Sequence, residues 1–238
     1  MTLRTRTIEY RDGDVLLEGE LACDDAASGP RPGVLVAHTW RGRGEFEAGK
    51  ARALAELGYA GFALDLYGKG VRGGSVEESR ALMRPFMEDR GLLARRMQLA
   101  LECLRAQDEV DPARTAAIGF CFGGLCVLDL ARSGADVGGV VSFHGVLKPP
   151  GTTSGNRIRA KVLVLHGWDD PLAPPDELVA LGRELTAAGA DWQIHAFGHT
   201  MHGFTNPQAN DPAFGTVYQP DADRRSWQLL ESFLREVL

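Results

Sequence analysis

The sequence lacks any long apolar run, and no stretch approaches the roughly 20 apolar residues that a membrane-spanning helix requires. Residues 1–11 alternate polar side chains and have no apolar segment of the signal-peptide kind. The sequence also lacks an excess of positive charge: 26 Lys and Arg stand against 32 Asp and Glu, for a formal net charge of -6. Nucleic-acid binding needs a basic face, which this balance disfavours. We therefore expect a cytoplasmic protein that has neither a membrane nor a nucleic acid as its partner.

Cysteine is scarce, and its four positions follow neither a metal-ligand spacing nor a disulfide pattern: Cys23, Cys103, Cys121 and Cys126. A chain of 238 residues can build a core without disulfides. No pair of histidines is spaced with a carboxylate as a metal site would be. We therefore expect a reducing compartment, no bound metal, and thiols that are available for chemistry.

The sequence has no internal repeat and no linker long enough to divide it. Apolar strand-like runs alternate with segments of helical period, which is typical of a mostly parallel sheet with helices on both faces. We therefore predict one α/β domain over residues 1–238. The predicted strands are Val15–Ala22, Gly33–His38, Ala60–Asp65, Thr115–Gly119, Val137–His144, Val162–Gly167 and Trp192–Phe197. The predicted helices are Glu47–Leu57, Glu77–Phe86, Leu92–Ala106, Leu125–Arg132, Asp176–Ala188 and Asp223–Val237.

The most informative motif is Gly119-Phe120-Cys121-Phe122-Gly123, which lies between a predicted strand and a predicted helix. A nucleophile between two glycines at a sharp strand-to-helix turn is the pattern of a nucleophile elbow, although serine usually holds the position of Cys121. The glycines allow the strand and the helix to approach closely, and a helix N-terminus favours a thiolate. Cys121 is therefore the candidate nucleophile. The alternative is a glycine-rich turn around a structural cysteine, which is our interpretation of the remaining cysteines: Cys23, Cys103 and Cys126.

Two later loops contain candidates for an acid and a base. Asp169 and Asp170 follow a predicted strand, and we favour Asp170 as the carboxylate that orients a catalytic histidine. Capping the next helix is the alternative for either aspartate. His199 and His202 follow the last predicted strand, and a base in this loop would complete the order nucleophile, acid, histidine. We favour His202, which is followed by Gly203 and Phe204. We expect a surface or core position for His195, and structural or pocket-lining roles for the histidines at the other strand ends: His38, His144 and His166.

Acyl transfer also requires hydrogen-bond donors aimed at the developing oxyanion. One candidate is the backbone N–H of Phe122, directly after the nucleophile, and the other is that of Trp40, in the loop after the strand Gly33–His38. The two aromatic side chains would then line an apolar pocket for the acyl or leaving group. Plain core packing is the alternative for Trp40.

Taken together, these residues resemble the dienelactone hydrolase family, whose members have the α/β-hydrolase fold. The resemblance spans nearly the whole chain after about residue 32 and rests on these stretches: Val34–Gly42, Gly58–Gly68, Gly119–Gly124, Gly167–Pro174 and His202–Phe204. It implies a monomeric, cofactor-free hydrolase of small carboxylic esters or lactones. The same resemblance implies Cys121 as nucleophile, His202 as base and Asp170 as acid.

Two positions depart from the family's pattern. Thr39 stands where the founding enzymes have a glutamate that helps to activate the thiol, and Asn206 stands where an arginine helps to grip a substrate carboxylate. Arg80 is a loose match for a second gripping arginine, and we count these three residues and Phe204 as candidate substrate-binding residues. Loss of one arginine removes charge-assisted hydrogen bonds to a carboxylate. We therefore expect a preference for neutral, activated esters, and we extend this expectation to activated phosphate triesters.

Two other interpretations of the same residues stay open. A thioesterase or acyltransferase would differ in the group that accepts the acyl group. A non-catalytic protein of the same fold would use the pocket to bind a small ligand. The complete set of Cys121, Asp170 and His202 disfavours a binding protein, because a binder has no need of all three.

Overall fold

A computed structural model of the chain describes residues 2–26, 29–151 and 155–238. The chain divides into two compact units, Met1–Ile118 and Gly119–Leu238. The boundary lies inside strand β5 (Val110–Phe120), so that its last residues, Gly119 and Phe120, belong to the second unit. Within the described ranges, no helix is long and apolar enough to cross a membrane.

The strands of the first unit follow the hydrogen-bonded order β1-β2-β4-β3-β5. Besides β5 they are β1 (Leu3–Asp12), β2 (Val15–Asp24), β3 (Arg31–Ala37) and β4 (Ala60–Ala63). β1 and β2 form an antiparallel hairpin, β2 pairs antiparallel with β4, and β4 runs parallel to β3. Every residue of β3 is buried, as expected of a strand that is covered on both faces. In β1, by contrast, Ile8 is the one buried residue, which suits an edge strand.

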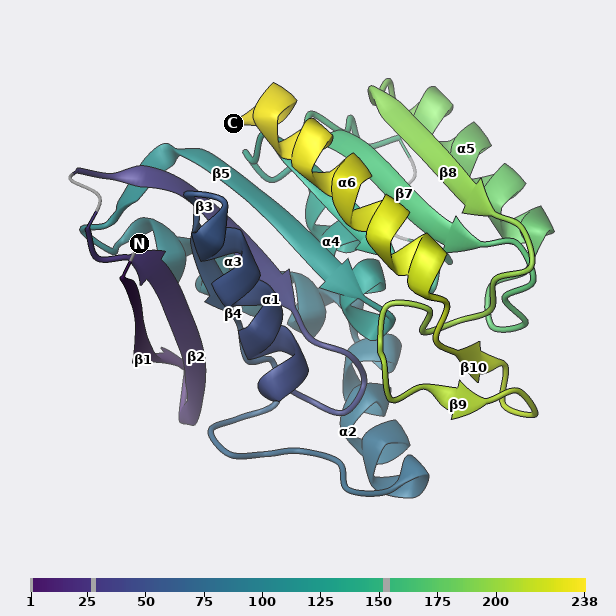
Figure 1. Cartoon of the computed structure of the whole chain (residues 1–238), viewed down its shortest axis with the longest axis horizontal. Coiled ribbons are helices and arrows are strands. Elements are labelled where there is room, and N and C mark those ends of the chain that lie inside the picture. The colour runs from purple at the N-terminus through teal and green to yellow at the C-terminus, as the bar shows by residue number, and fades with distance from the viewer. Residues whose placement is uncertain (1, 27–28, 152–154) are drawn as a thin grey trace. The chain divides into compact units, whose positions relative to one another are not determined.

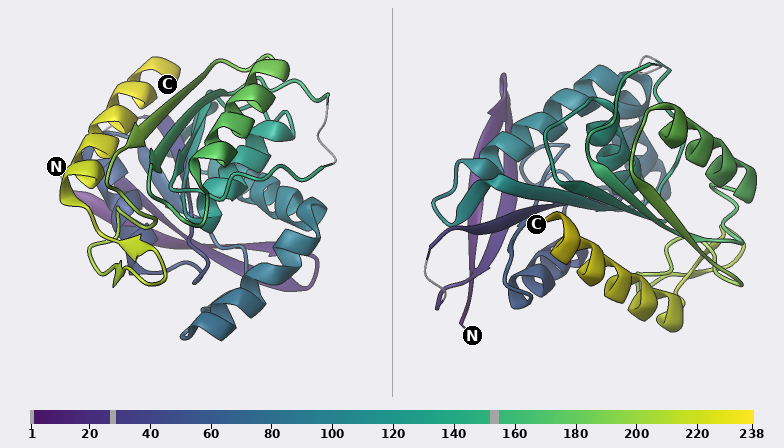
Figure 2. Two further views of the ribbon diagram at one scale, coloured as in Figure 1. Left: turned by 90° about the vertical axis from the view of Figure 1, so that its right-hand side faces the viewer. Right: turned by 90° about the horizontal axis from the view of Figure 1, so that it is seen from above.

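The helices of the first unit are α1 (Glu45–Glu56), α2 (Val76–Glu88) and α3 (Arg90–Arg105). The right-hand view of Figure 2 shows α1 and α3 on opposite faces of the strands. Gly61 in β4 explains how closely α1 can pack. A Cβ atom at this position would lie 2.3 Å from the backbone oxygen of Ala51, so a side chain here would push the helix away.

In the second unit, the parallel strands β6 (Gly139–Phe143), β7 (Lys161–Gly167) and β8 (Trp192–Phe197) follow one another in the sheet. The helices are α4 (Phe122–Arg132), α5 (Pro175–Ala187) and α6 (Pro220–Val237), and a short hairpin is formed by β9 (Asn210–Asp211) and β10 (Thr216–Val217). Figures 1 and 2 show α6 on one face of these strands and α4 and α5 on the other. This alternation of strand and helix places the loops after β6, β7 and β8 at the same edge of the sheet.

Helix α6 packs against the sheet through a stripe of apolar side chains. Leu230, Phe233 and Leu234 are buried. The Phe233 ring lies over Gly139 at the start of β6, where a Cβ atom would come within 2.7 Å of the ring. The missing side chain at Gly139 therefore makes room for the helix.

The predicted helices and strands all occur, and the structure adds β1, β9 and β10. The predicted start of α4 at Leu125 is wrong, because the helix begins at Phe122, directly after Cys121. The two glycines at its start have low helix propensity, which hides the first turn from a pattern-based prediction. The last helix likewise begins earlier than predicted, at Pro220 rather than Asp223, because proline suits the first helical position.

Candidate active site

Cys121 lies at a sharp turn between β5 and α4. Its backbone angles are φ 58° and ψ -116°, a conformation that L-residues rarely adopt. The turn depends on Gly119, where a Cβ atom would lie only 2.0 Å from the backbone oxygen of Gly123. The strand and the helix therefore meet too closely for any other residue at position 119. The sharp strand-to-helix turn that the motif predicts is present in the structure, and the role of Cys121 as nucleophile stays a prediction.

Backbone hydrogen bonding fixes the orientation of this turn. The N–H of Cys121 donates to the carbonyl of Phe143 at the end of β6, over 3.0 Å. Phe122, the predicted oxyanion donor, is the first residue of α4, and its side chain is fully buried. Cys121 itself is the N-cap residue of α4 and is partly exposed. Its thiol thus lies at the positive end of a helix dipole.

His202 and Asp170 form a buried hydrogen-bonded pair in the same unit. The Nδ1 atom of His202 lies 2.8 Å from the Oδ2 atom of Asp170, and both side chains are almost completely buried. The other carboxylate oxygen, Oδ1, accepts hydrogen bonds from the backbone N–H groups of Leu172 (2.8 Å) and Ala173 (3.3 Å). The carboxylate is thereby held by its own turn and directed at the imidazole.

The backbone of His202 is fixed by a segment further along the chain. Its N–H donates to the carbonyl of Gly215, and its carbonyl accepts from the N–H of Val217, each over 3.0 Å. The loop that carries the aspartate is joined to the loop that carries the histidine by a hydrogen bond from the N–H of Asp169 to the carbonyl of Thr200 (3.0 Å). These bonds hold the two loops in register, which a stable Asp–His pair requires.

The charge state of His202 is coupled to Cys121. Burial lowers the pKa of His202, but attraction by a negatively charged Cys121 and the hydrogen bond with Asp170 outweigh burial and raise the pKa to about 10. The Nε2 atom of His202 is buried and makes no regular hydrogen bond with any group among the described residues. A loose contact of this kind between a nucleophile and its base is common before a substrate binds. The surroundings of His202 therefore favour its charged imidazolium form.

The alternative acid and base, Asp169 and His199, take no part in the hydrogen bond between Asp170 and His202. Asp169 is near His199, with 3.9 Å between Oδ2 and Nδ1, and the His199 side chain is fully exposed. A solvated pair at this distance has little influence on the orientation of either group. Neither aspartate caps the next helix, because the N-cap residue of α5 is Pro174 and no side chain caps it.

Two further histidines are buried around the Asp–His pair. The ring of His144, at the end of β6, contacts the ring of His202 edge-on at 5.0 Å, and its Nε2 atom lies 2.8 Å from the hydroxyl of Thr205. His166, in β7, has its Nε2 atom 3.5 Å from Oδ2 of Asp170. The sequence places both at strand ends near the site, but it does not indicate which atoms they contact.

The remaining cysteines have ordinary structural surroundings. Cys23 and Cys126 are buried, and Cys103 is half-buried. Burial raises the pKa of the Cys23 thiol, and it raises that of Cys103 to about 11. Both thiols therefore stay protonated near neutral pH.

The predicted substrate-binding residues of the second unit have different surroundings. Phe204 is fully buried, and its ring contacts the rings of His144 (5.1 Å) and Phe197 (5.5 Å). Asn206 is half-buried, and its side-chain oxygen accepts a hydrogen bond from the N–H of Gln208 (3.0 Å). Phe204 thus supports the loop that carries His202, and Asn206 stabilises a turn without contributing charge.

The first unit contains the other predicted residues, Thr39, Trp40 and Arg80. Arg80 is exposed on α2, and Thr39 and Trp40 are half-buried in the loop after β3. That loop is held by Glu47, a buried residue that the sequence analysis missed. Its two oxygens accept hydrogen bonds from the N–H groups of Thr39 (3.1 Å) and Gly44 (2.9 Å). A glutamate three residues after a helix start is a recognisable capping signal.

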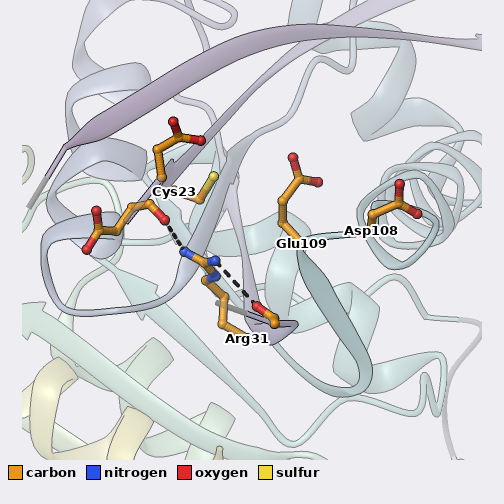
Figure 3. Close-up of a pocket in the computed structure, with 7 residues that line it drawn as sticks. Cys23, Arg31, Asp108 and Glu109 are labelled. Carbon is orange, nitrogen blue, oxygen red and sulfur yellow. Dashed lines mark hydrogen bonds between the residues drawn. The ribbon is translucent and has the colours of Figure 1, made fainter. Parts of the chain in front are cut away.

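Two hollows among the described residues have neither Cys121 nor His202 in their lining. Figure 3 shows one of about 240 Å³ in the first unit, where carboxylates and Cys23 surround Arg31. The Arg31 guanidinium donates to the backbone oxygen of Asp24 over 2.6 Å. The other hollow, about 660 Å³, is an apolar groove between α5 and β8 that includes Trp168 and Trp192. Across the described residues, no group of three or more His, Cys, Asp and Glu could hold a metal ion.

Parallel strands that alternate with helices, together with a strained residue at a sharp strand-to-helix turn, are typical of the α/β-hydrolase fold. Solved structures agree over the full chain. One named m3DLH is 40% identical, with a TM-score of 0.95 and complete coverage of both chains. A dienelactone hydrolase-like promiscuous phosphotriesterase from metagenomic libraries is 37% identical, with a TM-score of 0.93, covering 100% of this chain and 99% of that one.

The model of the dienelactone hydrolase family matches residues 17–238, so the chain belongs to that family. A protein of Aquifex aeolicus (strain VF5) named "Putative carboxymethylenebutenolidase" is 25% identical over 237 residues, covering 97% of this chain and 98% of that one. The resemblance expected from the sequence is confirmed. The chain is a hydrolase of the class that acts on esters and lactones.

Proposed function

We propose that the chain hydrolyses carboxylic esters or lactones through a covalent thioester on Cys121, with His202 as the base and Asp170 as the residue that orients it. The observation that carries this proposal is the buried 2.8 Å hydrogen bond between His202 and Asp170, in the same unit as the strained Cys121 and coupled to it by charge. A cysteine, a histidine and an aspartate in this relation are the parts that nucleophilic catalysis requires.

The reaction has two half-reactions. The Cys121 thiolate attacks the ester carbonyl and forms a sulfur–carbon bond, and the carbon–oxygen bond to the alcohol breaks as the His202 imidazolium protonates the leaving oxygen. A water molecule then attacks the thioester carbonyl, and His202 takes its proton. The carbon–sulfur bond breaks, which releases the carboxylic acid and restores the Cys121 thiolate beside the His202 imidazolium.

Stabilisation of the oxyanion is assigned to the start of α4. The backbone N–H of Phe122, the first residue of this helix, is one donor in the proposal. The N–H of Trp40, the second donor that the sequence predicts, stays a prediction. We expect the two amides together to account for a large part of the rate enhancement, because such donors act on charge that develops only in the transition state.

We infer the substrate preference from the absence of a positive charge at position 206. Asn206 has no positive charge where family members have an arginine, and its side-chain oxygen is engaged in a turn with Gln208. We propose that neutral aryl and alkyl esters are better substrates than a lactone that carries a carboxylate. The comparison of kcat/KM for p-nitrophenyl acetate and a carboxylate-bearing dienelactone tests this preference. A higher value for the lactone would contradict it.

A second candidate activity is the hydrolysis of activated phosphate triesters. It is favoured by one relative, at 37% identity, which is a promiscuous phosphotriesterase. In this reaction the thiolate would bond to phosphorus and displace an aryloxide, and water would then cleave the phosphorus–sulfur bond. Release of p-nitrophenol from diethyl p-nitrophenyl phosphate that depends on Cys121 would support this activity. Release at the same rate by Cys121→Ala would exclude it as a reaction of this site.

The main experiment is the turnover of p-nitrophenyl acetate and butyrate by the wild type and by Cys121→Ala, His202→Ala and Asp170→Asn. We expect the first two variants to be inactive, and Asp170→Asn to lose about 10³- to 10⁴-fold in kcat because the imidazole loses its orientation. Asp169→Asn is the matched control, since it changes the neighbouring exposed carboxylate, and it should retain wild-type turnover. Full activity of Cys121→Ala, or no wild-type turnover on any ester, would overturn the proposal.

A further inference from the structure

His166 is a fully buried histidine that the proposed reaction does not use. It lies in β7, four residues before Asp170, and its Nε2 atom is 2.9 Å from the carbonyl oxygen of Ala173. The same Nε2 atom lies 3.5 Å from Oδ2 of Asp170, the oxygen that also contacts His202. One atom of His166 thus faces both the acid and the turn that holds the acid.

The hydrogen-bond partner settles which nitrogen carries the proton. A carbonyl oxygen can only accept, so the Nε2 atom of His166 must be the donor to Ala173. The ring is then in the Nε2–H form, and this N–H group also lies on the side of Asp170. The Nδ1 atom is buried and has no hydrogen-bond partner among the described residues, so the second nitrogen contributes no competing contact.

The charge state fits a donor that does not compete with His202. Burial lowers the pKa of His166, and a positive charge on His202 lowers it further, although Asp170 opposes both effects. A neutral imidazole can hold a carboxylate through its N–H without neutralising the charge that attracts the imidazolium of His202. A lysine or arginine in this place would pair with Asp170 and weaken that attraction.

Hydrogen bonds connect Asp170, Ala173 and His166 in a chain. Oδ1 accepts the N–H of Ala173, while the carbonyl of Ala173 accepts the N–H of His166. His166 is therefore connected to Asp170 through Ala173, and its Nε2 atom also lies 3.5 Å from Oδ2 of Asp170. Removal of the imidazole would release both the carboxylate and one end of its turn.

We propose that His166 is a positioning residue that keeps the Asp170 carboxylate in the orientation that holds His202, a role that rests on the proposed function of this pair. If His166 contributed only to core packing, the expected effects of its substitutions would differ from those of a positioning residue. If packing were its whole contribution, an apolar residue of similar volume would replace His166 with little effect on catalysis, and a polar residue would replace it poorly.

The test compares His166→Leu with His166→Gln, because the amide nitrogen of glutamine can take the place of Nε2–H. We expect His166→Leu to lower kcat for p-nitrophenyl acetate about 10- to 100-fold with KM nearly unchanged, and His166→Gln to recover most of kcat. His195→Leu, which changes a half-buried histidine of β8 away from the pair, is the control and should keep the wild-type values.

A second readout does not depend on turnover. The Nδ1–H proton of His202 should give a far-downfield proton resonance that persists in His166→Gln and is lost or broadened in His166→Leu. If the wild type hydrolyses no ester, the proposed function fails, while this resonance still decides the role of His166. Unchanged kcat and resonance in both variants would overturn the inference. So would an equal loss in both variants that follows a fall in Tm, because that outcome describes a purely structural residue.

Discussion

Cys121 has backbone angles that cost free energy, and its neighbours explain why the chain keeps them. A non-glycine residue in this region is strained by about 1–3 kcal/mol, and such strain persists only where the surrounding structure determines it. Here the N–H of Cys121 is bound to Phe143, and the approach of Gly119 to Gly123 closes the turn. The strained turn holds the thiol at the N-terminus of α4, which is the position that the proposed nucleophile requires.

The first prediction concerns Gly119. Because a Cβ atom at this position would lie 2.0 Å from a backbone oxygen, the helix must shift to accommodate Gly119→Ala. We expect a loss of about 3 kcal/mol in the free energy of unfolding, together with loss of esterase turnover. Urea denaturation measures the first quantity. The matched control is Gly198→Ala, where nothing lies within 4 Å of the added Cβ and the expected change is within about 0.5 kcal/mol. Equal stabilities of the two variants would contradict the steric account.

The second prediction concerns the charge of His202. Its pKa is lowered by burial and raised to about 10 by Cys121 and Asp170, so the imidazolium persists well above neutral pH. In Cys121→Ser the attraction by the thiolate is removed, and we expect the pKa of His202 to fall by about one unit or more. NMR titration of the imidazole ring measures both values. The same pKa in the two proteins would show that Cys121 and His202 are not coupled.

The sequence predicts Cys121, Asp170 and His202 because each belongs to a motif with a known place in the fold. The choices of Asp170 over Asp169 and of His202 over His199 rest on family pattern, and the 2.8 Å contact agrees with both. The contacts of His166 could not be predicted in the same way. They depend on the fold of a turn, in which a backbone carbonyl faces the ring, and no side-chain pattern encodes the position of that carbonyl.

At the scale of elements, the hairpin β1–β2 is connected to α3 by charge. Asp12, at the end of β1, accepts hydrogen bonds from Nε of Arg95 and Nε of Arg96, each over 2.8 Å. Arg96 also donates to the backbone oxygen of Leu66. Hydrogen bonds from Arg95 and Arg96 lower the pKa of Asp12 to about 2, although burial opposes them. β1 buries little apolar surface, since Ile8 is its one buried residue. The hydrogen bonds of Asp12 with Arg95 and Arg96 are therefore important for holding the hairpin against α3.

The third prediction is the pH dependence of that contribution. A carboxylate whose pKa is lowered on folding stabilises the fold above its unfolded-state pKa of about 4, and the stabilisation is lost as the pH falls through about 2. We expect Asp12→Asn to lower the free energy of unfolding by about 2 kcal/mol at pH 7 and by less at about pH 3. Urea denaturation at both values measures the difference. Asp14→Asn, at an exposed position of the same turn, should change little at either. An effect of Asp12→Asn that grows toward low pH would contradict this account.

The sequence predicts the elements of the parallel sheet better than those at its edge. Strands such as β3 and β7 are continuous apolar runs, which is the signal of burial on both faces. β1 was missed because polar and charged side chains fill it and Ile8 is its one buried residue. The hairpin of β9 and β10 was missed because strands of two residues have no period to detect. This hairpin matters for the candidate site, because the backbone of Gly215 and Val217 forms hydrogen bonds with the backbone of His202.

At the scale of the whole molecule, the two compact units meet inside a strand rather than at a linker. β5 runs through the boundary between Ile118 and Gly119, and it ends directly before Cys121. β5 contributes residues to both units, so unfolding of this strand affects residues of both. Domain boundaries, by contrast, usually lie in exposed and flexible segments.

The fourth prediction follows from this boundary. We expect one cooperative thermal transition, with equal calorimetric and van't Hoff enthalpies, as the sequence-based prediction of one domain also requires. Differential scanning calorimetry measures both enthalpies. Two separated transitions would instead mean that the units are independent domains joined within β5.

The central claim is that the hydrolase forms an acyl-enzyme on Cys121, and mass spectrometry of a rapidly quenched reaction tests it most directly. The wild type is mixed with p-nitrophenyl butyrate, quenched in acid during the first turnovers, digested, and searched for a butyryl group. The account predicts this group on the peptide that contains Cys121, and its absence from the same peptide of Cys121→Ser with loss of turnover. A butyryl group on another residue, or hydrolysis by Cys121→Ser at the wild-type rate, would contradict the claim.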